Sequence, residues 1–552
     1  MLDRATVDSL FPSDLPEPAH WEERYPPRDL PDAALVTRFA PSPTGFVHVG
    51  GLYTAMISRD LARHSGGTYF VRIEDTDTAR EVAGADAQFA RAFDAFDLVP
   101  DEGDLAPAGS PTPYAPYRQS QRAEIYSSYA RELMRHGLAY PDFATKEELA
   151  EISDAQRTLK LPTGYYGRWA PWRDADDAEV ERRLEAGDPY VVRFRSEGRV
   201  GERTSFTDRL RGRVEAEDNH NDIVILKTSA SENRLPTYHF AHAVDDHLMR
   251  VSLVVRGDEW LSSVPLHRQL FSALGFAQVD YAHIAPLMKQ EGSSRRKLSK
   301  RKDDEASVDF YLEAGFPSEA VLCYLRGLAN ARLAELPLPE ALAAPLRLDE
   351  FGLAGPLVDT VKLADVAADH IATMPGDEVL ARVRAWAGGD DAELVAILDA
   401  HPDLARRAID VERVDVENPR KDLARWSDFR TAYGFFFPEL FTDVTDAGDE
   451  RLGGLDPALV RALAADLAGS YVHEGDQPTW FAQIRELAAR HGFAPNPKTY
   501  KSDPDAYPGM LRDAANVVRV AVTGAQRSPD LYEVTRALGA DEVLRRLRAL
   551  AG

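Results

Sequence analysis

Two neighbouring segments in the N-terminal half combine glycines and a histidine in a way that suits phosphate chemistry. The sequence reads RFAPSPTG over residues 38–45 and HVGG over residues 48–51. Glycines let the backbone approach a phosphate closely, and the N-terminus of a following helix favours negative charge. A histidine beside such a turn can donate a hydrogen bond to phosphate oxygens while charge builds up in a transition state. Taken alone, HVGG more often marks a tight turn with a surface histidine.

A second motif, KLSKR over residues 297–301, lies within the basic run SSRRKLSKRK. Lysines on a mobile loop can clamp a triphosphate and stabilise charge on the α-phosphorus and on the pyrophosphate leaving group. For an isolated KLSKR, a solvated basic loop is the simpler interpretation.

Charged and aromatic side chains elsewhere could bind the polar groups of a small ligand. In RIEDTD, the carboxylates that follow Arg72 could receive an ammonium group, or they could form a solvated acidic turn or a helix cap. In VRGDEW, Arg256 could hold a carboxylate through two hydrogen bonds. Trp260 could pack on a flat ligand or fill the core. The upstream PTYHFAHAVDDHLM carries histidines and aspartates, but their spacing matches no zinc pattern, so no metal is expected there.

These motifs need a scaffold, and the sequence predicts one of parallel α/β type. Residues 35–40 and 68–73 read as strands, with a helix between them from Gly50 to about His64. Strand, glycine turn, helix and strand in this order form the first unit of a parallel sheet. Ligands bind beyond the carboxyl ends of such strands, where the glycine turn and RIEDTD would both lie.

Further along the chain the pattern changes twice. Residues of about 119–237 read as a mixed insertion with a strand near 190–194, and the sheet pattern resumes over 236–256. After about residue 305 the chain is mostly helical, with an amphipathic helix expected over 541–551.

Composition limits the class of protein. The 552 residues include 65 basic and 90 acidic side chains, a net charge of −25, which is unusual for a nucleic-acid-binding protein. Local basic faces decide such contacts, however, and net charge does not exclude them. No run of about 18 apolar residues occurs, the N-terminus lacks the pattern of a signal peptide, and Cys323 is the only cysteine. We therefore expect a soluble cytoplasmic protein without a disulfide.

Taken in order, five segments resemble bacterial glutamyl-tRNA synthetases, which are class I aminoacyl-tRNA synthetases. They are RFAPSPTG with HVGG, RIEDTD, PTYHFAHAVDDHLM, VRGDEWLSS and KLSKRK. His48–Gly51 and Lys297–Arg301 match the two signatures known as HIGH and KMSKS. The resemblance covers about 35–330 and continues more weakly through PLVDTVKLADV, RKDLARWSDF and LRDAANVVRVAVTGAQRSPDLYEV. Five motifs in one order are much harder to obtain by chance than any single one.

The resemblance implies an α/β fold: a Rossmann-type catalytic domain with a parallel sheet and an acceptor-binding insertion, followed by an all-helical anticodon-binding region. The expected ranges are an N-terminal extension over 1–34, the first half of the catalytic domain over 35–118, the acceptor-end-binding insertion over 119–237, the second catalytic half over 238–290, the KMSKS loop with a tRNA stem-contact domain over 291–375, and the helical anticodon-binding region over 376–552.

The resemblance also implies roles for individual residues. Catalysis would depend on His48, Lys297 and Lys300. Glutamate would be bound by Arg38, Ser42, Glu74, Tyr238, His242 and Arg256. ATP would be bound by Pro41, Thr44, His48, Gly50, Gly51, Glu259, Trp260, Leu287, Met288, Lys297, Leu298, Ser299, Lys300 and Arg301.

Two departures from the family pattern stand out. Many relatives have asparagine where this chain has His242, which either donates a hydrogen bond to a glutamate carboxylate, directly or through water, or is a packing substitution. Many relatives also carry cysteines in the insertion where this chain has Asp142 and Ala144, so no zinc is expected.

The implied activity is that of a glutamate–tRNA ligase. It would use ATP with Mg²⁺ to form glutamyl-adenylate and would transfer the glutamyl group to the terminal adenosine of tRNA(Glu), as a monomer with no membrane contact. The alternatives are a glutamine–tRNA ligase, a shorter paralogue that modifies a tRNA base, and a non-catalytic tRNA-binding or regulatory module. In the helical region, candidates for anticodon contact that could equally be packing residues are Arg425, Trp426, Arg430 and Tyr433.

Overall fold

The protein is described by a computed structural model that covers residues 2–43, 45, 47–77, 82, 84–231, 233–414 and 416–552. The chain divides into two compact units, the first made of residues 1–310 and 322–359 and the second of 311–321 and 360–552. The chain changes units within helices α10 (Val308–Ala314) and α11 (Ser318–Ala329). Among the described residues, no helix is both long enough and apolar enough to cross a membrane. The finer domain ranges expected from the sequence stay predictions.

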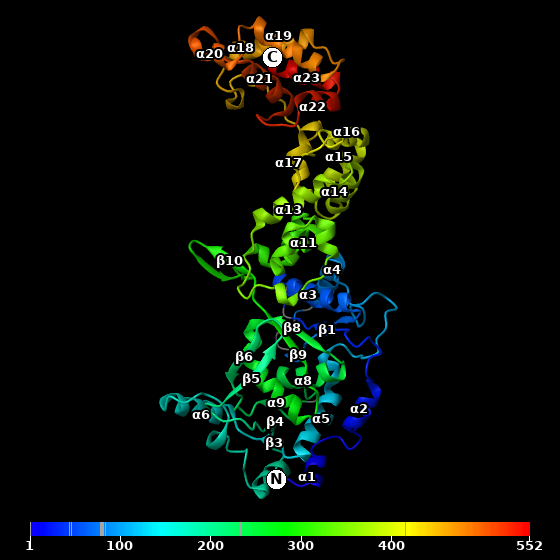
Figure 1. Ribbon diagram of the computed structural model, residues 1–552, viewed down its shortest axis with the longest axis vertical. Coiled ribbons are helices and arrows are strands. Elements are labelled where there is room, and N and C mark those ends of the chain that lie inside the picture. Colours follow the sequence, from blue (N-terminus) through cyan, green and yellow to red (C-terminus); the bar gives the residue numbers. More distant parts are fainter. Residues whose placement is uncertain are drawn as a thin grey trace. The chain divides into compact units, whose positions relative to one another are not determined.

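A four-stranded parallel sheet forms the centre of the first unit (Figure 1). Its order is β2 (Thr68–Val71), β1 (Val36–Phe39), β8 (Leu253–Gly257) and β9 (Asp280–Ile284). The chain runs outward from β1 in one direction through β2 and in the other through β8 and β9. The carboxyl ends of β1 and β8 therefore flank a switch point of strand order, where α/β sheets bind ligands.

Helix α3 (Val49–Ser65) joins β1 to β2, as the sequence predicted. His48 caps its N-terminus, and Gly66 ends it in the left-handed region with φ 71°. A Cβ at Gly67 would lie 1.9 Å from the carbonyl oxygen of Leu35, so this tight return to the sheet requires glycine. The parallel α/β fold is thus confirmed.

The predicted continuation of the sheet pattern over 236–256 is only half right. Residues Leu253–Gly257 form β8, but Tyr238–Leu248 form helix α8. In α8, Phe240 and Val244 are four residues apart and both buried, as are His242 and Asp246. This helical spacing was hidden because every position from 240 to 246 is buried, which removes the contrast between polar and apolar faces.

The insertion is built around an antiparallel sheet of order β3 (Ala139–Asp142), β4 (Val191–Phe194) and β7 (Val224–Leu226). A separate hairpin, β5 (Arg203–Asp208) with β6 (Gly212–Glu217), also belongs to this segment. The carboxylate of Asp142 is buried and accepts hydrogen bonds from Arg193 and from the Tyr165 hydroxyl. The other helices and strands of the first unit are α1 (Arg4–Ser9), α2 (Pro18–Arg24), α4 (Ala85–Ala95), α5 (Ala123–Arg135), α6 (Lys146–Thr158), α7 (Asp177–Glu185), α9 (Val264–Ala273), β10 (Met288–Glu291), β11 (Ser294–Lys297) and α12 (Leu338–Ala343).

The N-terminal extension packs against α5 and belongs to the same core as the sheet. Its buried side chains include Trp21 and Tyr25, which join the apolar cluster of the first unit. The indole N–H of Trp21 donates to the Ser128 hydroxyl at 2.9 Å, and Arg28 pairs with Glu102 at 2.6 Å. These long-range contacts make the extension a structural part of the unit.

We therefore expect Trp21→Ala to lower the melting temperature and to expose the extension to protease. Truncating a buried tryptophan typically costs about 3–5 kcal/mol of unfolding free energy. Trp21→Phe, which keeps most of the ring packing, should lose much less. Differential scanning fluorimetry and limited proteolysis would measure both effects. Equal stability of Trp21→Ala and the wild type would contradict this structural role.

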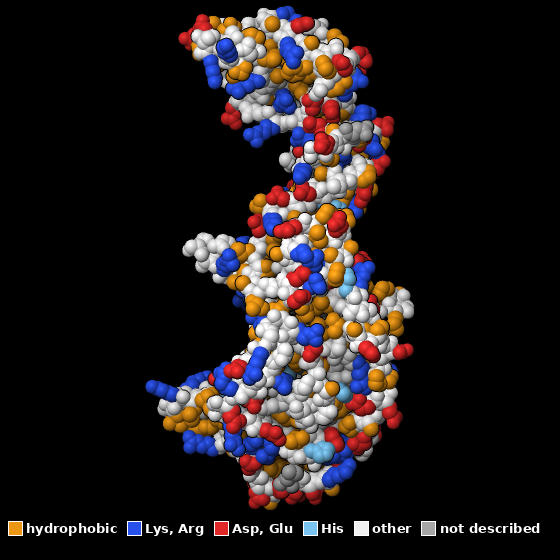
Figure 2. Space-filling view, in the orientation of Figure 1, with side chains coloured by type: hydrophobic (Ala, Val, Ile, Leu, Met, Phe, Trp, Pro, Cys, Tyr) orange, Lys and Arg blue, Asp and Glu red, His pale blue; other side chains and the backbone are white. Residues whose placement is uncertain are grey.

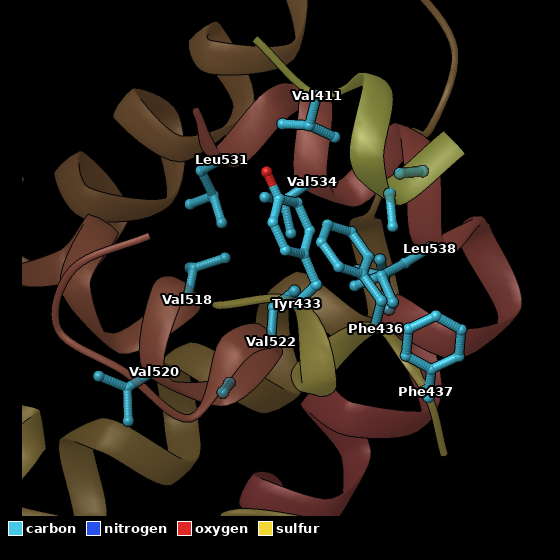
Figure 3. Close-up of a cluster of buried hydrophobic side chains, with 14 of the residues drawn as sticks. Val411, Tyr433, Phe436, Phe437, Val518, Val520, Val522, Leu531, Val534 and Leu538 are labelled. Carbon is cyan, nitrogen blue, oxygen red and sulfur yellow. The ribbon is translucent and has the colours of Figure 1, made fainter. Parts of the chain in front are cut away.

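All the regular secondary-structure elements in the described part of the second unit are helices. Its helices are α13 (Thr360–Ala372), α14 (Gly376–Asp390), α15 (Ala392–Ala400), α16 (Pro402–Asp410), α17 (Phe429–Tyr433), α18 (Pro457–Ser470), α19 (Gln477–Arg490), α20 (Pro497–Ser502), α21 (Leu511–Thr523), α22 (Leu531–Leu538) and α23 (Ala540–Ala551). Figure 3 shows aromatic side chains from 433–437 facing valines of α21 and α22.

The packing alternative is favoured for two of the four candidate anticodon residues, Trp426 and Tyr433. Tyr433 and Trp426 are buried in this core, so their rings offer no free face for a nucleotide base. Arg425 pairs with Asp428 and Arg430 pairs with Asp391, but both side chains are partly exposed, so the two alternatives stay open for these arginines.

Candidate functional site

Two cavities lie at the carboxyl ends of the four parallel strands, and their walls share Thr54 and Gly257. The lysine cavity, of about 450 Å³, is lined by His48, Gly50, Gly51, Tyr53, Thr54, Gly257, Glu259, Ile284, Ala285, Pro286, Leu287, Lys297, Leu298 and Lys300. The arginine cavity, of about 490 Å³, is lined by Arg38, Phe39, Ala40, Ser42, Pro43, Thr54, Glu74, Thr76, Asp77, Tyr238, Val255, Arg256, Gly257 and Trp260. Two ligands bound in these cavities would meet at the shared residues.

His48 stands at the N-terminus of α3 in a defined tautomer. Its Nδ1 accepts a hydrogen bond from the backbone N–H of Gly50 at 2.8 Å, so in the neutral ring the proton is on Nε2. Burial, together with the nearby Lys300 and Lys297 ammonium groups, lowers the pKa of His48 to about 4. The ring is therefore neutral at pH 7 and offers Nε2–H as a donor. A Cβ at Gly50 would lie 3.0 Å from His48 Nδ1, so a side chain there would press on the ring.

The KLSKR segment is less loop-like than expected. Lys297 ends β11 of a two-stranded hairpin with β10, and Leu298 is buried. The carboxylate of Asp303 accepts two hydrogen bonds from Arg296, at 2.6 and 2.7 Å, and one from the Ser299 backbone N–H at 2.9 Å. These bonds hold the segment in a turn that directs both Lys297 and Lys300 to the lysine cavity. Burial lowers the pKa of the Lys300 ammonium group.

Beneath the arginine cavity lies a buried charge network of three cations and three anions: Arg38, Arg72, Arg122, Glu74, Asp245 and Asp246. Asp246 accepts from Arg38 at 3.1 Å and from Arg72 at 2.6 Å, and Arg72 also pairs with Glu74 at 3.1 Å. Arg122 pairs with Asp245 at 2.7 Å. Burial is the main cause of the raised pKa of Glu74. An ammonium group in the cavity would stabilise the Glu74 carboxylate.

Arg256 differs from these arginines, because no carboxylate of the described residues forms an ion pair with it. It is only 6% exposed, and its guanidinium donates to His283 Nε2 at 3.1 Å and to His267 Nδ1 at 3.3 Å. Burial is the main cause of the lowered pKa of both histidines, which are therefore neutral at pH 7. A buried cation with uncharged neighbours is a strong site for an anionic ligand.

The structure brings most of the predicted site residues together. Five of the six residues expected to bind glutamate line the arginine cavity, the exception being His242. The three predicted catalytic residues line the lysine cavity, as do Gly50, Gly51, Glu259, Leu287 and Leu298.

Several residues expected to bind ATP do not line the lysine cavity. Trp260 lines the arginine cavity, with its ring 4.5 Å from that of Tyr238, because the turn after β8 directs it there. Neither cavity wall includes Pro41, Met288, Ser299 or Arg301, and Thr44 lies outside the described residues.

His242 lies behind the arginine cavity. Its ring is fully buried, with Nδ1 2.9 Å from an Asp246 carboxylate oxygen and Nε2 3.0 Å from the Tyr281 hydroxyl. Burial lowers the pKa of His242 to about 4, so the neutral ring donates Nδ1–H to Asp246 and accepts from Tyr281. Both nitrogens are thus used within the protein, which does not favour direct donation to a ligand. The geometry instead connects His242 through Asp246 to Arg38.

We expect His242→Leu to raise the KM for glutamate with little change in that for ATP, and His242→Asn to be tolerated, because asparagine retains a donor. The unfolded chain binds a proton at His242 near pH 6.5, whereas the folded protein does so only near pH 4. Its contribution to stability is therefore lost as the pH falls through this interval. The melting temperature of His242→Asn should fall less steeply between pH 7 and 5 than that of the wild type. Equal slopes would contradict the buried neutral state.

The sequence interpretation missed part of the lysine cavity wall. Strand β9 ends at Ile284 and is followed by Ala285 and Pro286. The apolar surface of these three residues continues to Leu287. A strand over DYAHI followed by proline is a recognisable signal, and the rule of carboxyl ends would have placed these residues at the site. Tyr53 and Thr54 also line the cavity; they belong to the first turns of α3, which the predicted helix included.

No group of three or more His, Cys, Asp and Glu side chains suited to a metal ion occurs in the described part of the chain.

Comparison with known proteins defines the class. Residues 34–338 match the family of tRNA synthetases class I (E and Q), catalytic domain, and residues 510–551 match an anticodon binding domain. The first match spans more than half of the chain. The chain accordingly carries the catalytic domain of a class I tRNA synthetase.

Individual relatives narrow this class. The chain is 40% identical to the glutamate–tRNA ligase of Clostridium beijerinckii over 532 residues, covering 96% of this chain and 95% of the relative. It is 39% identical to that of Sorangium cellulosum over 565 residues, covering 96% and 97%. A crystal structure of a glutamate tRNA ligase from Elizabethkingia meningosepticum in complex with its amino acid is similar, with a TM-score of 0.74 and 26% identity over 94% of this chain and 99% of that one. The chain belongs to the glutamate–tRNA ligase family.

Proposed function

We propose that the chain activates L-glutamate with ATP and Mg²⁺ and transfers the glutamyl group to the 3′-terminal adenosine of tRNA(Glu). The observation that carries this proposal is the set of buried charges in the arginine cavity wall: two arginines, Arg38 and Arg256, and one carboxylate, Glu74. Glutamate has two carboxylates and one ammonium group, so each ligand charge meets an opposite one. Asp77 also lines this cavity but is exposed, where solvent screens its charge.

The same charges favour glutamate over glutamine. Glutamine would replace one carboxylate by an amide and would leave one arginine without a full counter-charge. Arg256 would be affected most, because its protein neighbours are neutral. A site built to bind a charged group discriminates strongly against an analogue that lacks it.

The lysine cavity is suited to the nucleotide. The apolar wall from Ile284 to Leu287 fits the flat adenine, and the N-terminus of α3 favours phosphate oxygens. Neutral His48 can donate its Nε2–H to a phosphate oxygen, while Lys297 and Lys300 stabilise charge on the leaving group. Mg²⁺ would enter with ATP and neutralise further phosphate charge.

The reaction then needs only positioning and charge stabilisation. An oxygen of the glutamate α-carboxylate attacks the α-phosphorus, the bond to the bridging oxygen breaks, and pyrophosphate leaves with the electron pair. In the second step, a terminal ribose hydroxyl of tRNA attacks the carbonyl carbon, loses its proton, and AMP leaves. No step uses a nucleophile from the protein.

Two regions of the chain support the binding of tRNA. The match to an anticodon binding domain favours the helical region over 376–552 as the anticodon reader. The insertion over 119–237 is proposed to hold the acceptor end. Figure 2 shows Lys and Arg side chains gathered over the part of the first unit that carries α6. Exposed cations of α6 and the segment after it include Arg157, Lys160 and Arg168, which can contact phosphates despite the net charge of −25.

ATP–pyrophosphate exchange tests the proposal. Wild-type protein should exchange label with glutamate and much less with glutamine, each measured with and without tRNA(Glu). Charging of tRNA(Glu) with labelled glutamate tests the second step, and light scattering tests the expected monomer. Faster exchange with glutamine, or no charging of tRNA(Glu), would overturn the assignment.

A further inference from the structure

A chain of hydrogen bonds connects Arg256, on the side away from the cavity, to a residue outside the parallel sheet. Its Nε–H donates to His283 Nε2 at 3.1 Å, and His283 Nδ1 lies 2.6 Å from a carboxylate oxygen of Asp208. Both His283 and Asp208 are buried. His283 belongs to β9, whereas Asp208 is the last residue of β5 in the hairpin of the insertion.

The partners fix the tautomer of His283. An arginine N–H can only donate, so His283 Nε2 must accept and its proton must be on Nδ1, pointing at Asp208. The same Asp208 oxygen accepts the backbone N–H of His283 at 3.1 Å. Its other oxygen accepts the backbone N–H groups of Leu210 and Arg211, both at 2.9 Å. Every contact of this carboxylate is therefore with a donor.

We propose that Asp208 and His283 are positioning residues that fix the tautomer of His283 and thereby orient the Arg256 guanidinium toward its carboxylate ligand. The inference rests on the proposed function for the identity of that ligand, but the hydrogen-bond chain itself does not. A carboxylate that orients a histidine in this way acts through tautomer and geometry, and its amide analogue produces the wrong tautomer.

Two further hydrogen bonds join the β5–β6 hairpin to β9, and they help to fix the position of Asp208 relative to His283. The Arg209 backbone N–H donates to the Tyr281 carbonyl oxygen at 2.7 Å, and Arg211 Nε donates to the His283 carbonyl oxygen at 3.2 Å. Strand β5 lies beside β9 (Figure 1). Part of the insertion thus sets the position of a side chain in the amino-acid site.

Asp208→Asn tests the proposal with a nearly isosteric change. An amide has one oxygen, whereas all four donors around Asp208 need an acceptor. If the amide nitrogen faces His283, the ring must place its proton on Nε2, opposite the Arg256 N–H. We expect the KM for glutamate to rise about tenfold, the scale of one hydrogen bond to a charged group, with the KM for ATP unchanged. Asp280→Asn is the matched control, because Asp280 pairs with Arg209 of the same hairpin but is remote from Arg256.

If Asp208→Asn fails to fold, a pair of His283 variants tests whether Arg256 needs a hydrogen-bond acceptor at this position. Glutamine at 283 can place its amide oxygen near the Nε2 position and accept from Arg256, whereas asparagine ends near the Nδ1 position and cannot. His283→Gln should therefore retain a KM for glutamate near that of the wild type, and His283→Asn should raise it. Equal KM values for the two variants, or a parallel rise in the KM for ATP, would overturn the proposal.

One readout needs no substrate. In protein labelled with ¹⁵N-histidine, His283 should show a protonated Nδ1 and a bare Nε2, and Asp208→Asn should abolish this pattern. A bare Nδ1 in the wild type would refute the chain of hydrogen bonds. Absence of glutamate-dependent exchange by the wild type would instead refute only the proposed function.

Discussion

Replacing Arg256 by alanine is expected to cripple glutamate use while sparing ATP binding. Loss of one partner of a buried charge pair costs about 2–5 kcal/mol, which corresponds to a fall in kcat/KM for glutamate of about 30-fold to several thousand-fold. The fold should survive, because the protein neighbours of Arg256 are neutral and its removal leaves no buried charge unmatched. Steady-state pyrophosphate exchange at varied glutamate and at varied ATP concentrations measures the effect on each substrate.

The same variant should also lose its preference between amino acids. Glutamine lacks the second carboxylate, so its weak use should change less than that of glutamate. Arg256→Lys, which keeps the charge but not the fork of donors, should fall between the wild type and Arg256→Ala. Unchanged kinetic constants for glutamate in Arg256→Ala would remove this residue from the site.

Replacing Lys300 by alanine is expected to lower the rate of activation about 10²- to 10³-fold, the usual effect of removing one donor aimed at developing charge. Lys300 lines the lysine cavity, and burial lowers the pKa of its ammonium group, which indicates that folding desolvates it. The fold should stay intact, with a melting temperature close to that of the wild type. Pyrophosphate exchange and thermal melting on the same sample separate the two quantities.

Lys302→Ala provides the control, since Lys302 belongs to the same basic run but is exposed and does not line the cavity. It should exchange pyrophosphate like the wild type. If Lys300→Ala and Lys302→Ala behave alike, the position of Lys300 in the cavity has no catalytic meaning.

The glycine turn, the first strand–helix–strand unit and the charged residues of both cavities could be predicted from the sequence, largely because their signals are local. Turn residues at 41–51 and carboxylates at 74–77 follow short strands, and the rule of carboxyl ends then places them together. Motif order supplied the rest: Lys297 and Lys300 are remote in sequence from His48, and the resemblance to a known family predicted that they meet.

Other features could not be read in this way. Helix α8 is buried around almost its whole circumference, so its period is masked, and the position of His242 behind Arg38 depends on contacts with Asp246 and Tyr281. Trp260 was expected on the ATP side but lines the arginine cavity, because the direction of a side chain in a short turn is not a property of the motif. Asp208 carries no local signal, since its role exists only where the hairpin meets β9.

The charge network beneath the arginine cavity has a genetic consequence. Its three cations and three anions balance, so the loss of one member leaves a buried charge that no solvent screens. Asp245→Asn, for example, would leave Arg122 and Arg72 with one carboxylate fewer. Second-site revertants of such a strain should arise at these two arginines, by substitutions that remove a positive charge, and not at surface positions. Descendant sequences should accordingly exchange these residues in pairs, with the sum of their charges unchanged.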